Sequence, residues 1–169
     1  MMSAEHVMEH VACDFLAWVW YETERTGGRL DLGDPLGVVD VWVDERLAFR
    51  DNSDDRPRAV LTGENPSQTL EARAALAGGK FLRELQLGIR REEREYGVTL
   101  KGALLDFSGL KLPPGEAEED SVIYDRMFFY EELHAILSSL LKRLAVFRPT
   151  AAWEESESEA MSAWISGAS

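Results

Sequence analysis

The sequence predicts an α+β domain in which an antiparallel sheet of about five strands carries helices on one face. Three observations predict it: a strongly apolar helical stretch opens the chain, segments with the two-residue period of strands fill its middle, and a long helical stretch follows. The expected order is one helix, three strands, a short helix, two strands, a long helix and a tail. This order is typical of an antiparallel sheet with helices packed on it.

Residues 3–26 have the spacing of a helix, which Ser3 can cap and the Gly27-Gly28 pair can end. Apolar side chains fill more than half of its helical wheel. So broad an apolar arc predicts a helix that is buried on two sides, between the sheet and another helix.

The next segment changes to the period of strands. Apolar residues alternate over residues 38–43, and the pattern resumes at Leu47 and Phe49 after a tight turn expected at Asp44-Glu45. A third short strand is expected at residues 59–62. Together these segments predict an antiparallel meander.

A second helix and a second pair of strands follow. Residues 67–77 predict a short helix capped by Ser67 and stopped by a glycine pair. Residues 80–90 predict a strand, and the turn "RREERE" leads to a return strand that begins near Tyr96. The apolar residues of the return strand change from even to odd positions near Gly102, which predicts a bulge or bend there.

Residues 116–147 predict a long helix, which Pro149 ends. Apolar residues repeat along it at steps of three and four, as in a coiled coil, and form a candidate dimer or partner seam: Tyr130, Leu133, Leu137, Leu140 and Leu144. The alternative is that this seam packs on the sheet of its own chain. Residues 1–149 are expected to form a single domain, and residues 150–169 an acidic tail with a short amphipathic helix.

Composition narrows the classes of partner. The 169 residues carry a net charge of −13, which favours basic partners and, if spread evenly, repels DNA and acidic membranes. No apolar run approaches the ~18 residues that a membrane span needs, so no membrane partner is expected. The single cysteine excludes an internal disulfide. The first residues are acidic rather than typical of a secretory signal, so a cytoplasmic location is the simplest interpretation.

Three short motifs raise the question of an enzyme. His6 and His10 fit the H-x-x-E-H pattern of inverted zinc proteases, but they fall on the polar side of the first predicted helix, which favours a solvated helix face. Cys13 is favoured as a buried, inert thiol over a nucleophile. The run "AGGK" that ends at Lys80 follows a helix, whereas a phosphate loop precedes one. We therefore expect a protein that is not an enzyme and uses no metal or cofactor.

Positive charge is concentrated between residues 80 and 111, which hold seven basic and five acidic residues. The rest of the chain holds 11 basic and 26 acidic residues. As a DNA contact, these cations would grip phosphates without reading the sequence. The alternative is a solvated hairpin tip where Glu92, Glu93 and Glu95 neutralise the arginines. The candidate nucleic-acid-binding residues are Lys80, Arg83, Arg90, Arg91, Arg94, Lys101 and Lys111.

Several stretches, taken together, resemble the RdgC family of bacterial recombination-associated proteins. They are "FLAWVWYETE" (residues 15–24) before a glycine pair, "LEARAALAGGK" (70–80), and "LKLP" (110–113) before a long helix that contains "RMFFYEEL". The resemblance covers roughly residues 13–147. Familiar family members are nearly twice this length, so the chain resembles their C-terminal part only.

The resemblance implies an α+β, non-enzymatic protein that binds duplex DNA weakly, with little sequence preference, as a homodimer and restrains RecA-driven strand exchange. It implies a DNA-facing role for six of the candidate cations: Lys80, Arg83, Arg90, Arg91, Lys101 and Lys111. The net charge of −13 departs from what a protein that encircles DNA needs. The alternative is an acidic protein-interaction module or DNA mimic, whose partner is a basic, DNA-binding or recombination protein.

Overall fold

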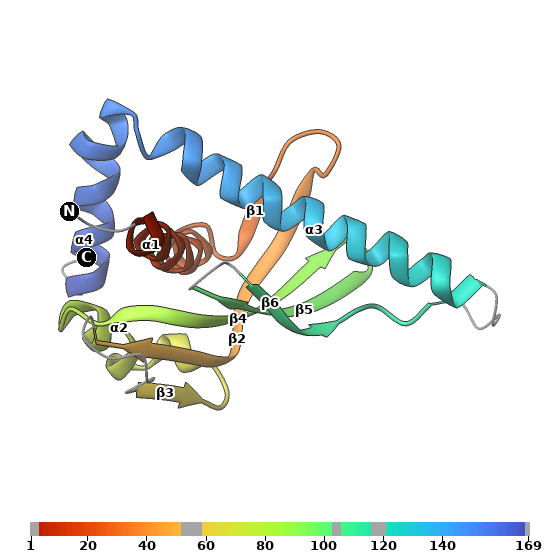
Figure 1. Cartoon of the computed structure of the whole chain (residues 1–169), viewed down its shortest axis with the longest axis horizontal. Coiled ribbons are helices and arrows are strands. Elements are labelled where there is room, and N and C mark those ends of the chain that lie inside the picture. The colour runs from red at the N-terminus through yellow and green to blue at the C-terminus, as the bar shows by residue number, and fades with distance from the viewer. Residues whose placement is uncertain (1–3, 52–58, 103–105, 116–120, 168–169) are drawn as a thin grey trace.

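The described part of the chain forms a six-stranded antiparallel sheet and four α-helices, as a computed structural model shows (Figure 1). The structure describes residues 4–51, 59–102, 106–115 and 121–167, and for residues 4–13 only the backbone. The predicted α+β class is confirmed. The sheet has one strand more than expected.

The elements follow one another as α1 (Ala4–Arg25), β1 (Arg29–Asp31), β2 (Val38–Arg50), β3 (Ala59–Thr62), a 3₁₀ turn η1 (Pro66–Gln68), α2 (Leu70–Ala77), β4 (Phe81–Arg91), β5 (Arg94–Lys101), β6 (Asp106–Lys111), α3 (Ser121–Phe147), a π-helical turn η2 (Trp153–Glu157) and α4 (Ser158–Ser166). The strand order is β1-β2-β4-β5-β6. β1 and β3 both pair with the edge of β2 that faces away from β4: β1 near the start of β2 and β3 near its end. Residues 103–105 and 116–120, where a bend and a helix start are predicted, lie outside the described residues.

β2 is one continuous strand, so the turn expected at Asp44-Glu45 is wrong. Val43 pairs with Leu87 and Leu47 pairs with Leu85, so three residues of β2 stand opposite one residue of β4. The extra residues form an irregular bulge. A bulge breaks the two-residue period just as a turn does, which is why the sequence pattern does not separate the two.

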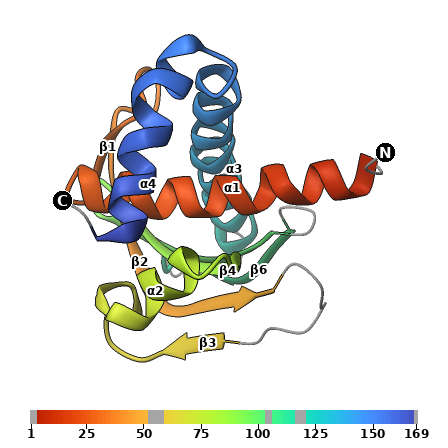
Figure 2. The same ribbon diagram turned by 90° about the vertical axis from the view of Figure 1, so that its left-hand side faces the viewer.

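α1 is buried on two sides, as its apolar arc predicts. All residues from Phe15 to Thr23 are buried. The helix lies above the sheet, with α3 and α4 against its other sides (Figures 1 and 2). Trp20 packs edge-on against Phe49 of β2 and Trp164 of α4. Burial of one such side chain contributes about 1.5–3 kcal/mol.

α2 begins at a different cap from the one expected. The Thr69 hydroxyl accepts a hydrogen bond from the Ala72 N–H at 3.3 Å, whereas Ser67 lies within the preceding turn η1. A threonine at this position satisfies an N–H that the first helical turn leaves unbonded. Gly79, with a φ of +83°, follows the end of the helix, as expected of the glycine stop.

The amphipathic helix expected in the tail is present as α4 and packs back onto the fold. The Trp164 Nε1 donates to Glu24 Oε2 at 2.7 Å, and its ring packs edge-on against Trp20 and Tyr21. α4 also lies beside α2 (Figure 2). The tail therefore contributes to the packing around α1.

Candidate functional site

The tip of the β4–β5 hairpin is held by a buried carboxylate of α3. Glu132 is only 8% exposed. It accepts hydrogen bonds from Arg91 Nη1 at 2.6 Å and from Arg94 Nε at 3.0 Å. The Tyr96 hydroxyl donates to the same carboxylate at 2.6 Å. These four side chains, which we call the Glu132 cluster, fasten α3 to the hairpin.

Hydrogen bonds keep the Glu132 carboxylate ionised. Burial alone would raise the pKa of Glu132, but the hydrogen bonds from Arg94, Tyr96 and Arg91 outweigh burial and hold that pKa below its ordinary value. Burial and the neighbouring carboxylate together raise the pKa of the Tyr96 phenol. At neutral pH the cluster therefore pairs one carboxylate with two guanidinium groups and a neutral phenol, which indicates a structural role.

Arg91 and Arg94 are consequently committed to internal contacts. The Arg91 side chain is 18% exposed and also donates to the backbone carbonyls of Leu36 and Pro35. The Arg94 side chain is 28% exposed and pairs with Glu92 at 3.0 Å. A phosphate group would have to displace these partners. Glu132, the main partner of both arginines, has no signal in the local sequence pattern, because it lies 41 and 38 residues away from them in the chain.

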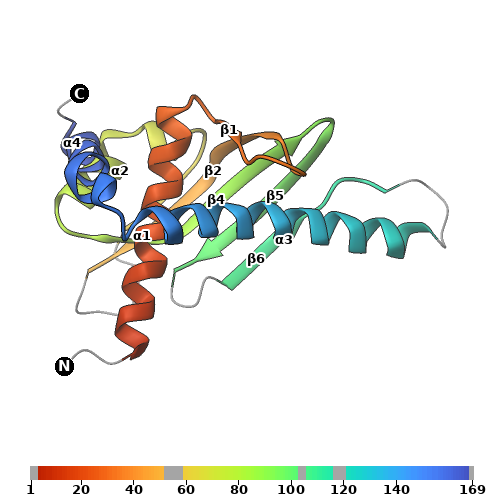
Figure 3. The same cartoon turned by 90° about the horizontal axis from the view of Figure 1, so that it is seen from above.

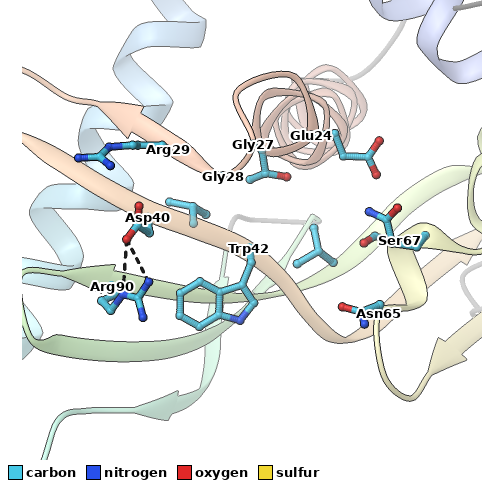
Figure 4. Close-up of a pocket in the computed structure, with 13 residues that line it drawn as sticks. Glu24, Gly27, Gly28, Arg29, Asp40, Trp42, Asn65, Ser67 and Arg90 are labelled. Carbon is cyan, nitrogen blue, oxygen red and sulfur yellow. Dashed lines mark hydrogen bonds and ion pairs between the residues drawn. The ribbon is translucent and has the colours of Figure 1, made fainter.

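Arg90 of β4 and Lys101 of β5 lie on the opposite face of the sheet, each next to acidic residues. Arg90 pairs with Asp40 at 3.2 Å (Figure 4). Lys101 stands in register between Glu84 of β4 and Asp106 of β6. Cross-strand partners share a face of the sheet, so the pairing register places negative charge beside both cations.

The other three candidate cations lie elsewhere. Lys80 precedes β4, about 30 Å along the strand from Arg90 at ~3.3 Å per residue. Arg83 is half-buried within β4. Lys111 lies across Gly97, with its Cβ 3.2 Å from where a Cβ on that glycine would stand. The seven candidates are thus not brought together on one surface.

Four of the five residues of the predicted partner seam are buried in their own chain. Leu133, Leu137, Leu140 and Leu144 are 1–3% exposed and belong to the hydrophobic core. They are not available to a partner, and the alternative of packing within the chain accounts for them. The spacing misleads because any helix that packs on a core has the same steps of three and four. Tyr130 differs from them, since it is 47% exposed.

A different side of α3 presents large apolar residues to solvent. We call it the α3 apolar face, and its members are Ile123 (66% exposed), Tyr124 (75%), Met127 (56%), Phe128 (52%) and Tyr130. The first turns of α3 project beyond the strands of the sheet (Figures 1 and 3). The sequence signal for this face is the run "RMFFY", which is too apolar for the solvated side of a helix.

Charged groups border the α3 apolar face. The Arg94 guanidinium lies 5.7 Å from the centre of the Phe128 ring, and Glu92 pairs with that guanidinium. Glu92 and Glu93 of the hairpin tip and Glu131 of α3 are exposed. An apolar centre with a polar rim is the usual anatomy of a protein–protein interface.

A cavity of about 800 Å³ opens on the other side of the molecule, beside the outer edge of β2 (Figure 4). Its walls come from the C-terminal end of α1, from the glycine pair that follows it, and from the loop and turn around Asn65 and Ser67. Residues Val41 to Val43 of β2 also line it, and the Asp40–Arg90 pair lies at one end.

Among the side chains that the structure describes, no group of three His, Cys, Asp or Glu lies close enough to hold a metal ion. His6, His10 and Cys13 lie on α1, but their side chains are outside what the structure describes. No helix in the described ranges is both long and apolar enough to cross a membrane.

Comparison with known proteins adds no relative: no protein-family model, no curated protein and no solved structure matches this chain. The resemblance to the RdgC family and the DNA binding it implies therefore stay predictions.

Proposed function

We propose that the protein is an acidic interaction module that binds a basic protein partner through the α3 apolar face. The observation that carries this proposal is the exposure of five large apolar residues on two turns of one helix. The same turns also join the core, because Phe129 packs edge-on against the core residue Tyr96. A contiguous apolar patch of this kind is typical of an interaction site.

The residue types of the face suit protein recognition. Aromatic residues and methionine are enriched at interfaces, and large aromatic residues dominate their binding energy. The Glu132 cluster fixes the helix against the hairpin, so the face is held in place before a partner arrives. A rigid binding surface loses less conformational entropy when it binds.

Charge indicates the class of partner. The chain carries −13, and the two cations at the face, Arg94 and Arg126, are accompanied by Glu92, which pairs with Arg94, and by the exposed Glu131 of α3. Two copies of such a chain repel each other, which disfavours self-association. A basic partner is attracted by the same charge, and the attraction raises its association rate. We therefore commit to a basic protein with an apolar patch rather than to a second copy.

Site-specific photocrosslinking tests where the partner binds. A benzoylphenylalanine is placed at Met127, and the matched control carries it at Leu70, an 83% exposed apolar residue of α2. In a lysate of the source organism, we expect position 127 and not position 70 to crosslink to a protein with a basic isoelectric point. Identical products at both positions, or crosslinks from Met127 only to a second copy, would contradict the proposal.

Weak duplex-DNA binding by a dimer is the competing proposal, which rests on the resemblance. Lys111 favours it, because this exposed lysine stands opposite Gly97 rather than an acidic residue. Anisotropy of a labelled duplex at about 50 mM salt separates the two proposals, since phosphate contacts are strongest at low salt. We expect no binding. Binding that charge reversal at Lys101 and Lys111 abolishes would favour DNA instead.

A further inference from the structure

The α3 apolar face is wider than the seam of a coiled coil. Each residue of a helix is rotated by about 100° from the one before it, so the face spans about 160° between its edges at Tyr130 and Phe128. Met127 lies near its centre, with Ile123 and Tyr124 to either side of it. The seam through which two helices pair is a narrower stripe. A single partner helix therefore covers only part of this face.

The side of α3 opposite the face is occupied by the protein's own chain. A Cβ on Gly115, in the segment after β6, would lie 2.9 Å from the Asp125 Oδ2. Phe129 packs edge-on against Tyr96, and Leu133 belongs to the hydrophobic core. These three residues of α3 project away from the face by the same helical geometry. The α3 apolar face is thus the side of these turns that is left for a partner.

A partner can contact the face from more than one direction. The first turns of α3 project beyond the strands of the sheet (Figures 1 and 3). Ile123, Tyr124 and Met127 are each more than half exposed. The hairpin tip borders the face at Phe128, where the Arg94 guanidinium lies over the ring. A partner surface that closes around the projecting turns can therefore bury both edges of the face.

An unpaired acidic residue follows the face along the helix. Glu131 is exposed, lies one turn beyond Met127, and points in nearly the same direction as the centre of the face. It forms no ion pair with any residue that the structure describes. The exposed Arg126 is about 140° away around the helix and does not neutralise it. A basic group of the partner is the natural complement of Glu131.

We infer that the partner receives the projecting end of α3 in an apolar groove, with one wall against each edge of the face and a basic residue at the mouth, opposite Glu131. Helix-in-groove complexes bury the apolar face of a helix in this way. The groove is about 10–12 Å wide, the diameter of a helix with its side chains, and extends about 12 Å along α3, from Ile123 to Tyr130. This inference rests on the proposed function and adds the shape of the partner surface.

Photocrosslinking at both edges of the face tests the groove. Benzoylphenylalanine is placed at Tyr124, at Tyr130 and, as the matched control on the same helix, at Val146, an apolar residue that is 73% exposed. Mass spectrometry of the products from a lysate of the source organism then identifies the partner segment that each position reaches. We expect Tyr124 and Tyr130 to reach two different segments of the protein that Met127 captures, and Val146 to reach neither.

The outcomes separate the groove from the proposed function. If Met127 captures the partner but only one edge crosslinks, or both edges reach the same segment, the groove is overturned and the proposed function stands. If Met127 captures no basic protein, both are overturned.

A pair of charge variants tests the mouth of the groove. Glu131→Gln and Glu155→Gln each remove one negative charge from an exposed glutamate, so they change the net charge equally. With the captured partner purified, we expect Glu131→Gln to weaken binding about two- to fivefold, the effect of an exposed ion pair, and Glu155→Gln to leave it unchanged. Equal affinities of the two variants would overturn the basic residue at the mouth.

Discussion

Replacing Glu132 by glutamine tests the Glu132 cluster, because it keeps the shape of the side chain and removes its charge. Removing one partner of a buried ion pair costs about 3–5 kcal/mol. Here Arg91 and Arg94 stay 18% and 28% exposed, and Arg91 keeps its two backbone acceptors. We therefore expect a loss at or just below the lower limit of that range, about 2–3 kcal/mol of the free energy of unfolding.

Urea unfolding at pH 7 measures this loss, with Glu84→Gln as the control. Glu84 pairs with Arg46 at 3.0 Å, but their side chains are 25% and 40% exposed, so its loss should cost less than about 1 kcal/mol. Equal effects of the two substitutions would refute the reasoning that burial makes the Glu132 cluster strong.

Four further predictions follow from the same structure. Below about pH 4, urea titrations should show the stability of the wild type falling more steeply than that of Glu132→Gln. The pKa of Glu132 is lowered by folding, so its contribution to stability is present above the unfolded pKa of about 4.3 and is lost as the carboxylate is protonated. Burial, and then the neighbouring Glu22, raise the pKa of Glu157. The contribution of Glu157 to stability is therefore present below its unfolded pKa of about 4.3 and lost as the pH rises and the carboxyl group ionises. Glu157→Gln should consequently melt at a higher temperature than the wild type at about pH 7 but not at about pH 4. Gly88→Ala should cost about 1–3 kcal/mol and shift the Trp42 indole resonance, because its Cβ would lie 2.0 Å from that ring. Thr69→Ala should cost about 1 kcal/mol in thermal melts through the lost cap of α2.

The elements of the fold could be predicted because their signals are local. The apolar arc of α1 and the alternation of β4 and β5 depend only on residues close in sequence. β1 could not be predicted in the same way, because it is three residues long and only Leu30 in it is buried. The bulge in β2 is decided by its pairing with β4, which no local pattern records.

The charges show why the site was harder to predict. A count over residues 80–111 treats them as one basic patch, but strand pairing puts Arg90 beside Asp40, which lies 50 residues away in the chain. Arg94 meets Glu132 across 38 residues. The α3 apolar face does have a local signal, the run "RMFFY", which is too apolar for the solvated side of a helix.

Calorimetric titration with the purified partner that photocrosslinking identifies tests the central claim most directly. The pair to compare is Met127→Glu and Leu70→Glu, which make the same change at two exposed apolar residues, 56% and 83% exposed. Burying a large apolar side chain contributes about 1.5–3 kcal/mol, so we expect Met127→Glu to weaken binding at least about tenfold and Leu70→Glu to leave it unchanged. Equal affinities for both variants would contradict the assignment of the α3 apolar face as the partner surface.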